Sequence, residues 1–278
     1  MKLTTIDTGL FKLDGGAMFG VVPKSIWNKI NPADTNNMCT WAMRCLIIED
    51  GDQLILIDTG IGNKQSEKFF SFYDLSGDNN IVTSLKKAGY DTKDVTDVIL
   101  THLHFDHCGG AVSLDKESGI FKPTFPNAVY HTHAKHWAHA MQPNPREKPS
   151  FLKENFELLQ QSGQLVFDDE NTSIGNHIQL RVVNGHTESM FVPRIDTGKE
   201  IIYYCADLIP SLGHLKVNYV MAYDIEPLKS MAERQAFLNI AMEENAKLFF
   251  EHDPKLACIS IRANDRGVAE MEDVFDIK

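Results

Sequence analysis

The sequence lacks the features that mark membrane and secreted proteins. No apolar run approaches the length of a membrane span, and the first ten residues have neither the basic start nor the apolar stretch of a signal peptide. The five cysteines are odd in number and form no Cys-x-x-Cys pair. We therefore predict a cytoplasmic protein with reduced thiols and no membrane partner.

Positive charge is also scarce. Lys and Arg together number 27, against 38 Asp and Glu, which gives a formal net charge of −11. Because an acidic surface repels phosphate backbones, we expect no nucleic acid as a partner and a small molecule as the substrate. The composition leaves a homodimer open as an alternative to a monomer.

Linkers and repeats are missing as well. The chain has no Ser/Gly run, no block of like charge, no low-complexity tract and no repeated motif. Its 278 residues are 43% apolar, which is enough to bury a full core. We predict a single domain over residues 1–278.

What the sequence does contain is a series of short apolar runs that end in polar residues. Alternating and continuous apolar runs predict strands at 1–10, 45–48, 54–57, 98–100, 128–130, 178–183, 190–195, 201–206 and 248–250. Capping residues and helical spacing predict helices at 81–88, 134–141, 155–161 and 228–245, the first with Asn80 as its N-cap and Gly89 as its stop. Residues 142–150 carry three prolines and should be irregular.

Four potential metal ligands fall within six residues, directly after the predicted strand at 98–100. In an extended segment, side chains two residues apart point the same way, so His102 and His104 can hold one ion together. Asp106 and His107 can then face a second ion beside the first, and imidazole with carboxylate suits zinc and similar ions. A chance cluster on a solvated loop would need neither the buried strand before it nor the Gly-Gly pair after it.

This His-x-His-x-Asp-His string resembles the signature of the metallo-β-lactamase fold superfamily, and the resemblance extends over residues 3–254. It implies an α/β fold, a four-layer αββα sandwich. It also implies seven metal ligands: His102, His104 and His186 for the first metal, Asp106, His107 and His252 for the second, and Asp207 for both. Asp58 matches a family aspartate that we expect to orient a ligating histidine rather than to bind metal.

The same resemblance implies a dinuclear metal-dependent hydrolase. We expect two divalent ions per chain, zinc first, with manganese, iron or cobalt as alternatives. A metal-bridging hydroxide would attack a lactone or ester carbonyl, with Asp106 and Asp207 as the catalytic carboxylates. The chain resembles quorum-quenching lactonases and methyl-parathion-hydrolase-like enzymes, so N-acyl homoserine lactones are the leading substrate, and the alternatives are an organophosphate phosphotriester hydrolase or a mononuclear-iron oxidoreductase of the same fold.

Departures from other branches of the superfamily narrow this choice. Asp207 stands where dinuclear β-lactamases have a cysteine, and the chain lacks the added domains of the thioesterase, flavodiiron and nuclease branches. His107 and His252 are both present, which disfavours the mononuclear oxidoreductases. Lactonases of this type often place a tyrosine three residues after the bridging aspartate, where this chain has Pro210, so the substitute is sought among Tyr219, Tyr223 and His214.

Two further segments are open to more than one interpretation. Residues 11–45 and 131–156 are long enough to roof a pocket, and the first is rich in aromatic residues and methionine. These apolar residues either form a wall for an acyl chain or pack in the core or at a dimer interface. The histidines of the second segment, His131, His133, His136 and His139, are expected mainly in packing or surface roles.

Overall fold

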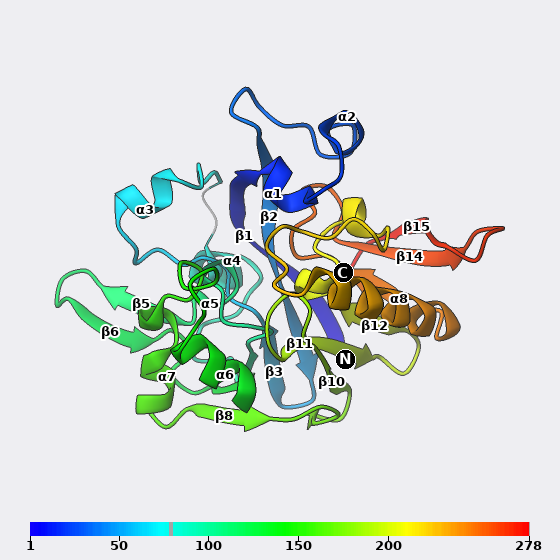
Figure 1. Ribbon diagram of the computed structural model, residues 1–278. Helices are drawn as coiled ribbons and strands as arrows, with labels where there is room; N and C mark the ends of the chain where they lie inside the picture. Colours follow the sequence, from blue (N-terminus) through cyan, green and yellow to red (C-terminus); the bar gives the residue numbers. More distant parts are fainter. Residues whose placement is uncertain (78–79, 278) are drawn as a thin grey trace.

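The computed structural model describes residues 1–77 and 80–277, and their strands form two large sheets and one hairpin (Figure 1). The first sheet has six described strands in the order β1-β2-β3-β4-β7-β8: β1 (Lys2–Asp14), β2 (Met38–Asp50), β3 (Gln53–Ile57), β4 (Asp97–Ile99), β7 (Val129–His133) and β8 (Leu165–Asp168). The second has seven in the order β15-β14-β13-β12-β11-β10-β9: β9 (Ser173–Ile174), β10 (Ile178–Val183), β11 (Met190–Asp196), β12 (Ile201–Tyr204), β13 (Lys247–Phe249), β14 (Cys258–Ala263) and β15 (Ala269–Phe275). The hairpin is β5 (Val112–Asp115) with β6 (Ile120–Pro123).

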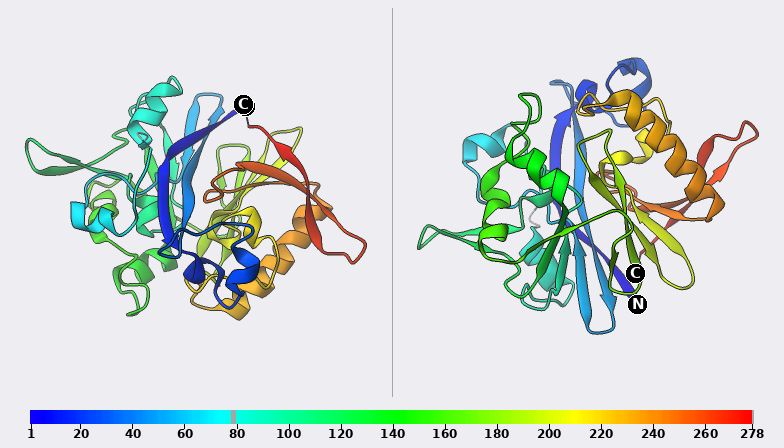
Figure 2. Two further views of the ribbon diagram at one scale, coloured as in Figure 1. Left: turned by 90° about the horizontal axis from the view of Figure 1, so that it is seen from above. Right: turned by 60° about the horizontal axis from the view of Figure 1, so that its bottom comes forward.

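Helices cover the outer faces of the two sheets. The views in Figure 2 place the long helix α8 (Pro227–Glu243) outside the second sheet and the shorter helices of the first half outside the first sheet. The shorter helices are α3 (Glu67–Ser71), α4 (Ile81–Lys87), α5 (Phe105–Cys108), α6 (Ala134–Met141), η1 (Lys153–Asn155) and α7 (Glu157–Gln161). The elements at the N-terminal end of β2 and around the site are α1 (Gly15–Phe19), α2 (Lys24–Trp27), η2 (Ala206–Leu208) and η3 (Leu212–His214). The result is the four-layer αββα arrangement that the sequence predicts.

The central strands β2, β3 and β4 of the first sheet are buried on both faces because they are apolar at successive positions. In β3, Ile55 and Ile57 face the core between the sheets, whereas Leu54 and Leu56 pack in the core beneath α4, α6 and α7. Side chains alternate between the faces of a strand, so a continuous apolar run fills both cores at once. This packing fixes the register of the strands whose ends carry the site.

Most predicted elements are confirmed. Asn80 caps α4 by accepting a hydrogen bond from Thr83 N at 3.1 Å, and α6 and α8 lie at the predicted places. The predicted helix at 155–161 is divided instead into η1 and α7, because Phe156, fully buried against Trp137, has a non-helical φ of −141°. The predicted strand at 201–206 ends at Tyr204, since the chain turns there into η2.

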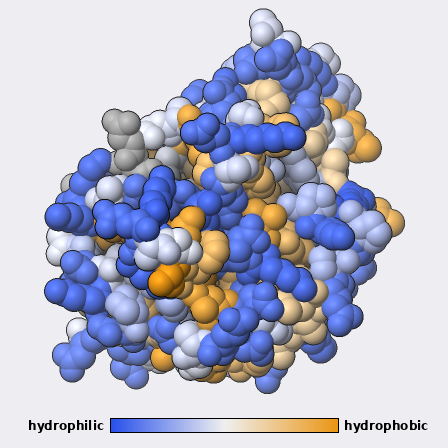
Figure 3. Space-filling model, turned by 90° about the vertical axis from the view of Figure 1, so that its left-hand side faces the viewer, coloured by the Kyte–Doolittle hydropathy of each residue, from blue (hydrophilic) through white to orange (hydrophobic). Residues whose placement is uncertain are grey.

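Large apolar patches are not evident on the face over α3 and the β5–β6 hairpin, which Figure 3 shows as mostly hydrophilic with small orange groups. Among the described residues, no helix combines the length and the apolar character needed to cross a membrane. The five cysteines, all in the described part of the chain, are buried and form no disulfide.

Candidate metal centre

The candidate ligands lie where strands of both sheets end. Strands β3 and β4 run parallel in the first sheet, and β12 and β13 run parallel in the second. Their carboxyl ends therefore meet at one edge of the sandwich, where irregular backbone can present polar side chains. The seven predicted ligands follow these ends or that of β10: His102 and His104 after β4, Asp106 and His107 in α5, His186 after β10, Asp207 in η2, and His252 after β13.

Glycine after the histidine string allows this approach. A Cβ on Gly110 would lie 2.2 Å from the carbonyl oxygen of Thr59, a distance that real Cβ atoms do not reach. The loop after β3 can therefore pack directly against the end of α5, and Thr59 N donates to the carbonyl of His107 at 2.8 Å. This contact places Asp58, the residue before Thr59, against the imidazole of His107.

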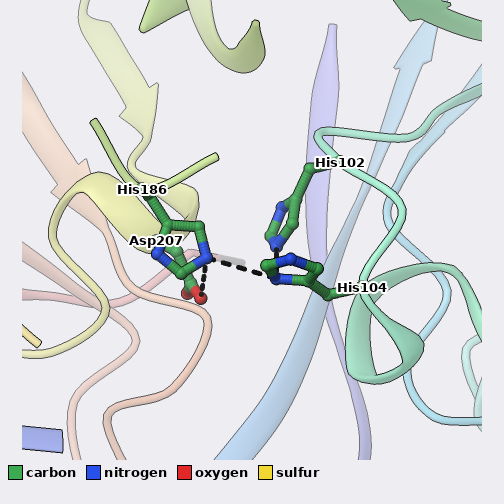
Figure 4. A group of neighbouring side chains, drawn as sticks. All are labelled: His102, His104, His186 and Asp207. Carbon is green, nitrogen blue, oxygen red and sulfur yellow. Dashed lines mark hydrogen bonds and ion pairs between the residues drawn. The ribbon is translucent and has the colours of Figure 1, made fainter. Parts of the chain in front are cut away.

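The structure brings three predicted histidines and Asp207 into a first cluster (Figure 4). Nε2 of His102 lies 3.0 Å from Nδ1 of His104, and Nε2 of His186 lies 3.3 Å from the same atom. Oδ2 of Asp207 is 3.2 Å from Nε2 of His186. Lone pairs on imidazole nitrogens this close repel one another, and a shared cation would remove that repulsion, so the geometry fits a metal site.

Asp106, His107 and His252 form a second cluster beside the first. Nε2 of His252 is 3.1 Å from Nε2 of His107, and Oδ2 of Asp106 lies 3.8 and 3.7 Å from these two nitrogens, respectively. The other oxygen of Asp207, Oδ1, faces this cluster, 3.1 Å from His252 and 3.6 Å from His107. Asp207 thus directs one carboxylate oxygen to each cluster.

These residues fit a pair of divalent cations. Oδ1 of Asp207 is buried and makes no hydrogen bond, a state that costs free energy unless a cation binds there. Nδ1 of His252 lies 2.7 Å from the carbonyl of Ala42, which can only accept, so Nδ1 carries the proton and Nε2 presents its lone pair to the centre. The remaining nitrogens of His107 and His186 face Asp58 and Asp224 at 3.1 and 2.9 Å, as is typical of metal-bound histidines.

The pKa values of the candidate ligands shift in different directions. Burial and the neighbouring histidines lower the pKa of His102 well below its usual value, which favours the neutral form that binds metal. Burial would lower the pKa of His252 too, but the Asp207 carboxylate outweighs it and raises this pKa to about 9. In the first cluster, burial would lower the pKa of His186, but Asp207 and Asp224 raise it, so protons compete with a metal in both clusters.

A cavity opens directly onto the clusters. Its wall combines apolar and polar side chains: Leu13, Met18, Phe105, Met221, Tyr223, Ser150, Arg146 and Glu147, with the ligands His104, Asp106, His186, Asp207 and His252 at its base. Of the segment 11–45, Leu13 and Met18 line the cavity. Phe19, Trp27 and Trp41 are buried in the apolar cluster that also contains Met18 and do not line the cavity. The aromatic residues of this segment thus serve packing.

Lactonases of this type often have a tyrosine at the position of Pro210. Of the three residues considered as its replacement, Tyr223 alone lines the cavity. His214 is fully buried, stacked on Phe19 at 4.6 Å between ring centroids, and its Nε2 lies 2.8 Å from the carbonyl of Met18. Tyr219 packs in the same cluster as Phe19.

The second group of histidines has structural partners. Nε2 of His136 accepts a hydrogen bond from Leu103 N at 2.8 Å, and its Nδ1 donates to Glu188 O at 2.6 Å, which holds the backbone between His102 and His104. Its burial lowers its pKa to about 3, in keeping with the neutral form. His131 lies between two aspartates, 2.8 Å from Asp168 and 3.1 Å from Asp97.

Three acidic residues that contact the ligands were not predicted from the sequence. Asp224 contacts His186, Glu251 lies 2.9 Å from Nδ1 of His107, and Glu147 lies 3.9 Å from Nε2 of His104. Glu251 was visible as the neighbour of His252, but the chain separates Asp224 from His186 by 38 residues. Only the folded arrangement shows which histidine each one faces.

Comparison with known proteins agrees with this geometry. The sequence model described as "Metallo-beta-lactamase superfamily" matches residues 44–252. An N-acyl homoserine lactonase of Bacillus thuringiensis is 24% identical over 245 residues, 82% of this chain and 87% of the relative. A probable metal-dependent hydrolase from Staphylococcus aureus superposes with a TM-score of 0.88 at 25% identity, covering 99% of this chain and 98% of its own. A dizinc quorum-quenching lactonase, solved in complex with a product, has a TM-score of 0.79 at 23% identity and covers 99% and 95%.

Proposed function

Since this metal-dependent hydrolase belongs to the metallo-β-lactamase superfamily, we propose that it opens N-acyl homoserine lactones at a centre of two divalent ions, zinc first. The observation that carries the dinuclear centre is Asp207, whose two oxygens face two separate clusters of imidazole nitrogens. The lactone assignment is supported by relatives that are named N-acyl homoserine lactonases, which this chain matches over 87% of their length.

In this proposal the two clusters are the two metal sites. His102, His104 and His186 hold the first ion, Asp106, His107 and His252 hold the second, and Asp207 binds both. When bound, such a pair of ions supplies a hydroxide at neutral pH and polarises a carbonyl oxygen. This chemistry needs no serine or cysteine side chain as a nucleophile.

The chain itself positions the substrate and handles the leaving group. Leu13, Met18, Phe105 and Met221 give the cavity apolar walls against which an acyl chain can lie. Burial and the nearby Asp106 carboxylate raise the pKa of Tyr223, so its hydroxyl stays protonated and can donate a hydrogen bond to a lactone oxygen. The Asp106 carboxylate, at the base of the cavity, is placed to take up the proton that the attacking water or hydroxide releases and to return it to the ring oxygen as it leaves.

We also propose that the chain is one domain whose segments 11–45 and 131–156 roof the pocket. Leu13 and Met18 come from the first segment, and Arg146, Glu147 and Ser150 come from the second. Arg146 ties the second segment to the loop that carries Tyr223, since its Nη2 donates to the carbonyl oxygens of Ala222 and Asp224.

A hydrolysis panel on metal-reconstituted protein tests the function. It should contain lactones of several acyl lengths, a phosphotriester, a thioester and a β-lactam, each with zinc, manganese, iron or cobalt. We expect lactone opening, with kcat/KM rising by up to about fourfold per methylene until the pocket is full. Turnover of the phosphotriester alone would transfer the assignment to organophosphate hydrolysis. Binding of fewer than two ions per chain after reconstitution would reject the dinuclear centre.

A further inference from the structure

The histidines of the candidate centre differ in how their outward nitrogens are held. The outward nitrogens of four of them lie within 3.2 Å of a partner: Thr101 Oγ1 for His102, Asp58 and Glu251 for His107, Asp224 for His186, and Ala42 O for His252. His104 is the exception, because it presents Nδ1 to the cluster, and its Nε2 is buried without a hydrogen bond. A neutral imidazole that binds metal through Nδ1 carries its proton on Nε2, so this atom needs an acceptor.

Glu147 is the acidic group that faces this nitrogen. Its Oε1 lies 3.9 Å from Nε2 of His104, at the rim of the cavity. The carboxylate is almost completely buried, with 3% of the residue exposed. A buried carboxylate away from any cation would be costly, so its placement here calls for a positive partner or strong donors.

Donors from three elements fix the Glu147 carboxylate. Thr187 Oγ1 donates to Oε1 at 2.7 Å, His139 Nε2 lies 2.7 Å from Oε2, and Asn144 Nδ2 donates to Oε2 as well. Thr187 directly follows His186, so the Glu147 carboxylate contacts both the segment that carries His186 and the ring of His104. The rings of His186 and His104 face each other in Figure 4.

From this arrangement we propose that Glu147 is a positioning residue of the first metal site. It is the acceptor for Nε2 of His104 when Nδ1 binds metal, and through Thr187 it holds the backbone that carries His186. This role rests on the proposed dinuclear centre. The position of residues 144–147, part of the pocket roof, then depends on whether a metal occupies the first site. This is because the Glu147 carboxylate contacts the ligand His104 directly.

Metal affinity distinguishes this role from a purely structural one. Zinc should be titrated against a chelator in the wild type, in Glu147→Gln, and in Glu154→Gln, an exposed carboxylate of the same region as the matched control. We expect Glu147→Gln to weaken one of the two binding steps by about 10–100-fold and the control to weaken neither. Asp58→Asn, which acts on His107, should weaken the other step, so the double variant weakens both.

The apoprotein supplies a second measurement. Glu147→Gln turns an amide NH2 toward one of the donors that hold the Glu147 carboxylate and lowers the Tm of the apoprotein in either case. A purely structural role lowers the Tm equally with and without zinc, whereas a positioning role gives a larger loss of Tm with zinc than without. Cobalt-substituted Glu147→Gln should also show an altered d–d absorption band. If Glu147→Gln does not fold, Glu147→Asp keeps the charge but withdraws it from His104, and the same loss of one step is expected.

The outcomes separate this inference from the proposed function. Wild-type protein that binds fewer than two ions refutes the dinuclear centre itself. Wild-type protein that binds two ions, with Glu147→Gln equal to the Glu154→Gln control in both steps, refutes the positioning role and leaves the proposed function intact. Equal weakening of both steps together with an equal loss of Tm with and without zinc likewise refutes it.

Discussion

Asp58 offers a test of how the second cluster is held, because two carboxylates share one imidazole nitrogen. Nδ1 of His107 lies 3.1 Å from Oδ2 of Asp58 and 2.9 Å from Oε2 of Glu251. Asp58 also accepts from Thr101, at 2.8 Å from the backbone N and 2.7 Å from Oγ1. Asp58→Asn removes the charge and keeps the side-chain shape. The φ of 57° at this position is one that asparagine adopts readily, so the backbone is retained.

The expected loss is modest because Glu251 remains. A hydrogen bond to a charged group contributes about 1.5–3 kcal/mol, which corresponds to roughly 10–100-fold in affinity. Burial raises the pKa of Glu251 to about 8, and the charge of Asp58 adds to that rise. Removing the Asp58 charge therefore lets Glu251 ionise more completely at neutral pH and take over its role. We expect about a tenfold loss of zinc affinity in the second step.

The double variant gives the decisive comparison. Asp58→Asn and Glu251→Gln should each cost little, whereas together they leave His107 without an acidic partner, so the combined loss exceeds the product of the single losses. Chelator competition on the four proteins of this cycle measures the coupling. Unchanged affinity in both single variants and the double would show that Asp58 only closes the turn after β3, and strictly multiplicative losses would refute the shared-acceptor argument.

Three other perturbations follow from the same contacts. Asp207→Asn removes the charge between the clusters, and we expect loss of the second ion by elemental analysis and a fall in rate of at least 100-fold; near wild-type turnover would make this residue structural. His131→Gln should destabilise the fold by roughly 3 kcal/mol, because it leaves two buried aspartates without their cationic partner. Burial would lower the pKa of His131, but the two carboxylates raise it above 6.5. The stabilisation of the fold by protonated His131 is therefore complete below pH 6.5 and is lost as the pH rises through the raised pKa. Denaturant unfolding should therefore show a larger difference at about pH 5.5 than at about pH 9, and a difference that grows with pH contradicts the charge assignment. Tyr223→Phe should lower kcat by about 10–100-fold with unchanged metal content, while Tyr219→Phe, whose ring lies in the core, should not; equal effects on kcat would remove Tyr223 from the reaction.

The fold was predictable where the sequence carries strong periodic or capping signals. The apolar runs at 54–57 and 98–100 predicted buried strands, and the helix start at Asn80 followed from its capping chemistry. The helix boundary near Phe156 was missed, because burial of that ring against Trp137 overrides local helical preference. No local signal marks such an override, since it depends on a residue 19 positions earlier in the chain.

Four of the candidate ligands could be predicted from their spacing in the sequence, whereas the acidic residues that contact the ligands could not. His102, His104, Asp106 and His107 lie within six residues, so chain geometry alone brings them together. Asp224 and Glu147 lie on loops, and their side chains reach the ligands only because distant strands end at the same edge. Their residue types are common on any acidic surface, and the sequence has 38 such side chains from which to choose.

The histidines show most clearly that residue type does not determine role. His136 and His104 are both buried, and the ring centroids of both lie within 6 Å of Phe151, yet they serve opposite purposes. Both nitrogens of His136 are occupied by backbone groups, so it has no lone pair to offer a metal. His104 has Nδ1 facing two other imidazoles and Nε2 facing a carboxylate. A histidine becomes a candidate ligand when one nitrogen is left free toward the centre and an acceptor can hold the other, whether that acceptor is a carboxylate, a hydroxyl or a backbone carbonyl. This condition is met at the meeting strand ends but not on α6.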